Sequence, residues 1–211
     1  MKLWWRLIQF GFHLLYNQLA FTYDMVSWLV SLGSWRHWQR AVIPFLPPPA
    51  DVPILELAHG TGNLQLDLLA AGYQTIGYDL SPYMGRIARR KLLRAGYQMR
   101  LVRGKAQQLP FPTGVFAAVV VTFPTAFIIE PATLKEAHRV LSDDGVLIVV
   151  SGGMLTGGGL LKRFIEWLYV ITGQRKSHLS LHYFEDFGFT VSLEQVACPR
   201  SIAQVLIARK I

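Results

Sequence analysis

The stretch LELAHGTGNL, residues 55–64, joins an apolar run to a tight turn with glycine at positions 60 and 62. Glycine permits both the backbone angles of a sharp turn and the close approach of a ligand to the main chain. The run that leads into it, from Val52 to Leu57, contains a single acid, Glu56. The stretch therefore predicts a strand, a ligand-binding turn and the beginning of a helix.

The composition describes an apolar and basic chain. Its 211 residues suffice for one well-cored domain and hardly for two. With 52% hydrophobic residues and a mean hydropathy of +0.30, surplus apolar surface must face a lipid, an apolar ligand or a partner. The net charge of +8 favours an anionic partner, either an acidic membrane or nucleic acid. The single cysteine, Cys198, excludes an internal disulfide and a cysteine-rich zinc site, and it favours a reducing compartment.

The N-terminal segment, residues 1–21, is rich in Leu, Phe and Trp but does not predict a transmembrane helix. Arg6, Gln9, His13 and Asn17 break every apolar run well short of the ~20 residues that a span needs. Together with Lys2 they fall on one narrow stripe of a helix. Two interpretations remain open: a helix that lies in a membrane interface or roofs an apolar pocket, and a helix that packs on its own domain.

The prolines at positions 44, 47, 48 and 49 divide the chain into a helical preface, residues 1–46, and a domain over residues 47–211. In that domain apolar runs alternate with helical patterns, which predicts an α/β fold: a Rossmann-like, doubly wound sheet of about seven strands, mostly parallel. The expected strands are 53–58, 74–78, 98–103, 116–121, 144–151, 189–197 and 203–209. The expected helices are 62–71, 82–95, 132–142, 158–172 and a short one before residue 187.

A second acid, Asp79, stands just past the second expected strand. A carboxylate there can accept both hydroxyls of a ribose, and the helix that begins beside the glycine turn offers its positive end to an anionic group. A nicotinamide dinucleotide requires G-x-G-x-x-G, whose third glycine is missing here. S-adenosylmethionine has no pyrophosphate, and Glu56 suits its positive charges. The ordered set Glu56, Gly60, Gly62 and Asp79 therefore favours S-adenosylmethionine.

Four segments carry a resemblance to a known family. ELAHGTGNL resembles D-L-A-G-G-T-G-D-L, and residues 23–46 resemble Y-D-x-x-x-x-x-x-S-x-G-x-H-x-x-W-K-R. Residues 104–123 resemble G-D-A-x-x-L-P-F-x-D-x-x-F-D, and HRVLSDDGVLIVV resembles E-x-x-R-V-L-x-P-G-G-x-L. The chain thus resembles the class I S-adenosylmethionine-dependent methyltransferases (methyltransferase type 11). It is most similar to the ubiquinone/menaquinone-biosynthesis C-methyltransferases.

The resemblance implies a role for individual residues. Gly60, Thr61 and Gly62 would line the methionyl arm, Asp79 would hold the ribose, and Ala106 would offer its N–H to the adenine. Tyr23 and Thr122 would border the reacting methyl group. Lys105 stands where the family usually has an acid that faces the adenine amine, which weakens adenine recognition or leaves it to backbone groups. The complete expected cofactor-binding set is Tyr23, Glu56, Ala58, His59, Gly60, Thr61, Gly62, Asp79, Leu80, Met84, Lys105, Ala106, Gln107 and Thr122.

The expected function is methyl transfer from S-adenosylmethionine to a lipophilic small molecule, with a prenylated quinol favoured. The alternatives are a phospholipid amine N-methyltransferase, a non-catalytic binding protein that retains the fold, and a nicotinamide-dependent reductase, which the missing glycine disfavours. No catalytic base is assigned, because structural roles are favoured for the histidines at 37, 59, 178 and 182, and no metal site is expected.

The expected location is the cytoplasm, with peripheral contact at the inner face of the membrane through the N-terminal helix. Eight basic residues between Arg86 and Lys105 could instead bind RNA phosphates. Four of them fall at helical spacing and few aromatic residues accompany them, so a solvated or lipid-facing helix is favoured and a nucleic-acid partner is not expected.

Overall fold

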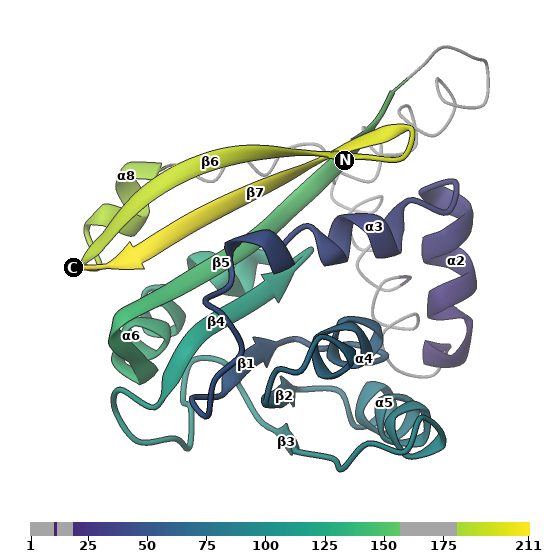
Figure 1. Ribbon diagram of the computed structural model, residues 1–211, viewed down its shortest axis with the longest axis horizontal. Helices are drawn as coiled ribbons and strands as arrows, with labels where there is room; N and C mark the ends of the chain where they lie inside the picture. The colour runs from purple at the N-terminus through teal and green to yellow at the C-terminus, as the bar shows by residue number, and fades with distance from the viewer. Residues whose placement is uncertain (1–10, 12–18, 157–180) are drawn as a thin grey trace.

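A seven-stranded sheet runs through the computed structural model, which describes residue 11, residues 19–156 and residues 181–211, and helices cover both faces of that sheet (Figure 1). The strand order is β3-β2-β1-β4-β5-β7-β6. Only β7 runs against its neighbours. The strands are β1 (Ile54–Leu57), β2 (Thr75–Asp79), β3 (Leu101–Arg103), β4 (Phe116–Thr122), β5 (Leu141–Leu155), β6 (Phe189–Cys198) and β7 (Ser201–Lys210). The predicted doubly wound, mostly parallel sheet is confirmed.

The described helices include two from the preface. The α-helices are α2 (Tyr23–Val30), α3 (Trp35–Arg40), α4 (Asn63–Ala70), α5 (Pro82–Arg94), α6 (Pro131–Val140) and α8 (Leu181–Glu185). Short 3-10 turns are η1 (Ala20–Thr22), η2 (Ile43–Phe45) and η3 (Ala126–Ile129). None of the helices in the described part of the chain is long and apolar enough to cross a membrane.

The core is split by the sheet into two layers, because side chains of a strand alternate between its faces. Leu55 and Leu57 of β1 join a cluster that includes residues of α6 and Phe184 of α8. Ile54 joins the opposite cluster, which includes Trp38 of α3 and two leucines of α4. Strands buried on both faces read as continuous apolar runs, which is why VPILEL and FAAVVVT are recognisable in the sequence.

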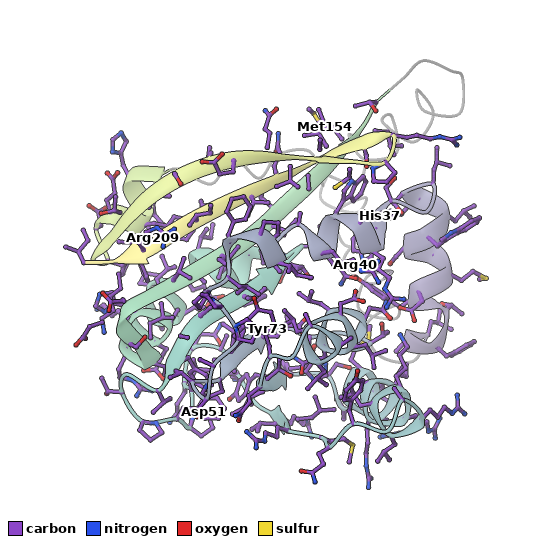
Figure 2. All side chains as sticks on the ribbon, in the orientation of Figure 1. His37, Arg40, Asp51, Tyr73, Met154 and Arg209 are labelled. Carbon is purple, nitrogen blue, oxygen red and sulfur yellow. The ribbon has the colours of Figure 1, made fainter. Side chains whose placement is uncertain are left out.

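The preface is fastened to the sheet by α3. Arg36 and Arg40 both bind the carboxylate of Asp67 on α4, with N–O distances of 2.8 and 2.7 Å, and Figure 2 shows Arg40 on α3 above α4. Trp38 donates from Nε1 to Ser201 Oγ at 2.9 Å. Its ring also lies so close to Gly153 that a Cβ there would stand 2.2 Å from the ring. These contacts hold α3 against α4 and against strands β5 and β7 near Gly153 and Ser201.

Several element boundaries differ from the sequence prediction, and the pairing of the strands explains two of these differences. The helix expected to end at residue 142 ends at Val140, because Leu141 is already extended with ψ 138° and pairs with Phe116. Strand β5 continues to Leu155 rather than 151, because β7 supplies an antiparallel partner as far as Ser201. The expected helix 158–172, His178 and the whole N-terminal stripe lie outside the described residues.

Candidate functional site

The predicted site residues come together at one edge of the sheet, where the parallel strands β3, β2, β1 and β4 end. Leu57 at the end of β1 lies beside Tyr78 of β2 and Val121 of β4. Asp79 lies beside Arg103 of β3. Ligands of open α/β sheets bind at this carboxyl edge, in the crevice where the strand order reverses. Here that reversal falls between β1 and β4.

The turn after β1 has a left-handed backbone at three positions: Ala58 (φ 55°), Gly60 (φ 54°) and Gly62 (φ 79°). A Cβ at Gly62 would stand 2.8 Å from Cβ of Ala88, so only glycine lets α4 and α5 pack this closely. A Cβ at Gly60 would meet nothing nearer than the Ala58 carbonyl at 4.0 Å. Gly62 is thus needed for helix packing. Gly60 instead leaves open space beside the backbone, which allows a ligand to approach closely.

Asp79, the last residue of β2, ties the turn to the neighbouring strand. Its Oδ2 accepts a hydrogen bond from the Gly60 N–H at 2.9 Å, and its Oδ1 accepts one from the Ser81 N–H at 2.7 Å. An ionised carboxylate can accept about four hydrogen bonds, so capacity remains for two hydroxyls. Asp79 therefore both orders the turn and offers acceptors at the end of the sheet.

Glu56 is completely buried in β1. Its Oε2 accepts a hydrogen bond of 2.7 Å from Gln65 Nε2, and Gln65 Oε1 in turn accepts one of 2.7 Å from Thr75 Oγ1. Its Oε1 has no partner. Burial raises the pKa of Glu56 to about 8, and the nearby Asp79 charge adds to the effect while the Gln65 hydrogen bond opposes it. A positively charged ligand group near Oε1 would supply both the missing partner and the missing charge.

His59 lies inside the turn and is buried. Its Nδ1 lies 2.9 Å from the Gly60 carbonyl oxygen. Burial lowers the pKa of His59, with Asp79 opposing, so the ring is neutral at neutral pH. His37 is exposed on α3 (Figure 2). His182 pairs with Glu185 on α8, which packs on the face of the sheet opposite α3. None of these three histidines is therefore presented as a general base in the site.

A contact that the sequence analysis missed joins the preface to the turn. Asp24 of α2 accepts hydrogen bonds from Thr61 Oγ1 at 2.6 Å, Asn63 Nδ2 at 3.0 Å and Lys91 Nζ at 2.6 Å. Burial alone would raise the pKa of Asp24, but these three partners lower it below its ordinary value. The signal was available, since Asp24 is the acid of the Y-D pair in residues 23–46.

Aromatic rings line the end of β4. Trp35 stacks on Phe123 with ring centroids 3.9 Å apart, and Tyr23 meets Trp35 edge-on at 6.3 Å. Phe123 has a φ of 51°, which turns the chain directly after Thr122. Both residues expected to border the reacting methyl group are thus next to this cluster: Tyr23 contacts Trp35, and Thr122 directly precedes Phe123. Trp35 and Phe123 are about ninety residues apart in the sequence, so sequence analysis could not show that their rings are in contact.

The remaining expected residues follow β2 and β3. Leu80 is exposed, whereas Met84 is a buried residue of α5. Lys105 is exposed, and its carbonyl oxygen lies 3.4 Å from the hydroxyl of Tyr78. Ala106 packs on the core beside Tyr78, and Gln107 donates to Glu130 at 2.7 Å. The Gln107–Glu130 hydrogen bond connects the loop after β3 to the beginning of α6.

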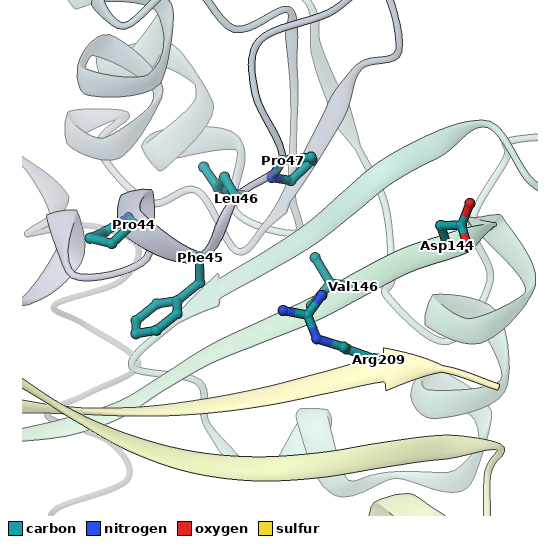
Figure 3. Close-up of a pocket in the computed structure, with 7 residues that line it drawn as sticks. All are labelled: Pro44, Phe45, Leu46, Pro47, Asp144, Val146 and Arg209. Carbon is teal, nitrogen blue, oxygen red and sulfur yellow. The ribbon is translucent and has the colours of Figure 1, made fainter.

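Two cavities lie elsewhere. One, of about 260 Å³, is lined by Pro44, Phe45, Leu46, Pro47, Asp144, Val146 and Arg209 (Figure 3). The other, of about 250 Å³, is lined by residues that include Thr75, the first residue of β2. Neither touches the glycine turn. Within residues 19–156 and 181–211, no group of three or more His, Cys, Asp or Glu side chains is placed to hold a metal ion.

Comparison with known proteins agrees with this geometry. Residues 54–145 match a family model described as a methyltransferase domain. This part of the chain is therefore similar to a methyltransferase domain, and the match includes the glycine turn, Asp79, Lys105 and Thr122. The fold is also that of a solved S-adenosylmethionine-dependent methyltransferase from Thermotoga maritima, with a TM-score of 0.62 at 21% identity over 89% of this chain and 94% of that one.

Sequence relatives point to the same group that the motifs indicated. Demethylmenaquinone methyltransferase of Thermus thermophilus is 37% identical over 139 residues, which are 64% of this chain and 63% of that protein. A ubiquinone/menaquinone biosynthesis C-methyltransferase of Citrifermentans bemidjiense is 28% identical over 142 residues, covering 64% of this chain and 60% of that protein. The matched part thus spans less than two thirds of either relative.

Proposed function

We propose that this chain transfers a methyl group from S-adenosylmethionine to a lipophilic small molecule, with a prenylated quinol as the favoured acceptor. The observation that carries the proposal is the meeting of three features at one sheet edge: the open backbone at Gly60, the carboxylate of Asp79 and the unpartnered Oε1 of Glu56. Together they fit a ligand that combines ribose hydroxyls with positive charge.

In this proposal each part of the site has one task. Gly60, Thr61 and Gly62 line the methionyl arm. Glu56 pairs with the ammonium group of that arm, and Asp79 binds the ribose hydroxyls. The adenine lies against the group Leu80, Met84, Lys105, Ala106 and Gln107, with Tyr23, Ala58, His59 and Thr122 toward the methyl group. Residues 47–211 form the cofactor-binding domain, and residues 1–46 form a preface that serves as a substrate lid or faces the membrane.

The protein's own contribution is positioning. Bound in this site, S-adenosylmethionine supplies an already activated methyl group. The Trp35, Phe123 and Tyr23 rings provide an apolar wall that can hold a flat acceptor and exclude water beside Thr122. With His59 neutral and buried, the site offers orientation rather than a strong base.

A lipophilic acceptor is supported by the apolar surface of the preface. Phe21, Met25, Trp28, Leu29 and Leu32 recur at helical spacing along and just past α2, and each is between 43% and 74% exposed. Such a stripe suits contact with a membrane that dissolves the acceptor. The Thermus thermophilus relative, named for a demethylmenaquinone, supports a quinol in particular. A phospholipid amine remains the alternative acceptor.

The proposal is tested by incubating the full chain with S-adenosylmethionine labelled on its methyl group and a total lipid extract, kept reduced so that quinols persist. The expected result is label in a quinol ring, identified by mass spectrometry of the extracted product. Label in a phospholipid headgroup would instead support the N-methyltransferase. Tight binding of S-adenosylhomocysteine with no labelled product would support a binding protein that retains the fold.

A further inference from the structure

Gln39 of α3 carries a buried amide that the protein does not satisfy. The side chain is 8% exposed, and its Nε2 makes a long hydrogen bond of 3.5 Å to Thr122 Oγ1. Its Oε1 has no hydrogen-bond partner in the part of the chain that the structure describes. Buried amides are normally paired, since an unpaired one loses its hydrogen bonds to water without replacement. An amide left in this state beside a proposed reaction centre points to a partner that arrives with a ligand.

The surroundings of Gln39 describe the ligand. On the same short helix, the indole Nε1 of Trp35 is also buried without a partner. The Trp35 ring stacks on Phe123, the residue after Thr122, so the unsatisfied polar atoms sit beside flat apolar surface. A planar aromatic ring that carries polar substituents matches both features.

The polarity of Gln39 selects the substituent. The amide oxygen of Gln39 accepts a hydrogen bond and cannot donate one. A hydroxyl group on the acceptor can donate to Oε1, and an ether or a ketone cannot.

We propose that Gln39 orients the methyl acceptor by accepting, at Oε1, a hydrogen bond from a neutral hydroxyl group on the acceptor's aromatic ring. The proposal rests on the proposed function, since it names a contact in the same site. Gln39 Nε2 donates to Thr122 Oγ1, so the amide would position the hydroxyl group of the acceptor relative to the end of β4.

The test compares a naphthalene-1,4-diol bearing a short prenyl chain with its two monomethyl ethers. Binding to the full chain is measured anaerobically by calorimetry, with S-adenosylhomocysteine present. We expect the diol to bind about three- to tenfold more tightly than at least one ether, the value of one hydrogen bond. Gln39→Leu should remove this difference by weakening the diol alone, whereas Gln39→Glu, which keeps acceptor oxygens, should retain part of it.

Gln195→Leu, a matched change at an exposed position of β6, should leave all three affinities unchanged. Equal binding of the diol and both ethers to the unaltered protein would overturn the proposal without any variant. Equal weakening of all three by Gln39→Leu would assign Gln39 a purely structural role. Failure of S-adenosylhomocysteine to bind the unaltered protein would instead contradict the proposed function itself.

Discussion

At the scale of single residues, Ala58 carries conformational strain. Its φ of 55° is a left-handed value that costs an L-residue about 1–2 kcal/mol and glycine little. We expect Ala58→Gly to relieve this strain, partly offset by the greater freedom of glycine in the unfolded chain, and to raise the free energy of unfolding by up to about 1 kcal/mol. Urea unfolding measures it. Ala70→Gly, in the last turn of α4, is the control and should destabilise; the same loss at both positions would refute the strain.

Glu56 should make stability depend on pH. Because burial raises the pKa of Glu56 to about 8 from 4.5, the folded protein keeps a proton that the unfolded chain has released. Its contribution to the free energy of unfolding is therefore full below 4.5, falls as pH rises and is lost above about 8.

Glu56→Gln keeps the shape of the side chain and an oxygen that can accept the hydrogen bond from Gln65, but it removes the titratable carboxyl group. The variant should lose less stability than the original between about pH 5 and pH 8, measured by urea unfolding across that window. It should also bind S-adenosylmethionine more weakly, because a cationic ligand can displace the proton of Glu56 and pair with the resulting carboxylate, whereas an amide stays neutral. Identical pH profiles for the two proteins would contradict the buried, protonated Glu56.

At the scale of elements, Asp24 couples α2 to the glycine turn. The Lys91–Asp24 pair is partly exposed, so solvent reduces its value, and the hydrogen bonds from Thr61 and Asn63 carry much of the coupling. Asp24→Ala should therefore weaken S-adenosylhomocysteine binding about fivefold, by loosening the turn. Calorimetric titration measures this change. Lys91→Met removes the charge partner and a hydrogen bond to Asn63 Oδ1, but it leaves the Thr61 and Asn63 donors on Asp24. It should have a smaller effect, and equal effects would show that Lys91 dominates the coupling.

Elements were easier to predict than the contacts between them. Buried parallel strands are continuous apolar runs, and glycines and prolines mark their ends, so the strand and helix order could be read locally. Asp24 and Thr61 are 37 residues apart, and Gln39 and Thr122 are 83 apart, so only the folded sheet brings them together. The raised pKa of Glu56 could likewise not be predicted from the sequence, because it follows from burial rather than from residue type.

At the scale of the whole molecule, α2 should attach the protein to anionic membranes. Trp28 and Leu29 are exposed, and the Lys91–Asp24 pair joins α2 to α5, whose arginines at 86, 89, 90 and 94 are exposed. Burying each apolar side chain is worth ~1.5–3 kcal/mol, and each nearby arginine adds ~1 kcal/mol on an anionic surface.

Trp28→Glu with Leu29→Glu should therefore release the protein from vesicles rich in phosphatidylserine, as measured by co-sedimentation. Leu193→Glu, at an exposed position of the edge strand β6, is the control and should change little. Unchanged sedimentation of the α2 variant would exclude this helix from the membrane contact. The affinity for S-adenosylhomocysteine should be the same in all three proteins.

The central claim is that the sheet edge at Gly60 and Asp79 binds S-adenosylmethionine, and calorimetric titration with S-adenosylhomocysteine tests it most directly. We expect saturable binding to the unaltered protein and none of NAD. Asp79→Asn should weaken S-adenosylhomocysteine about ten- to a hundredfold, because hydrogen bonds to a charged acceptor are worth ~1.5–3 kcal/mol. Saturable binding of NAD without binding of S-adenosylhomocysteine would contradict the account.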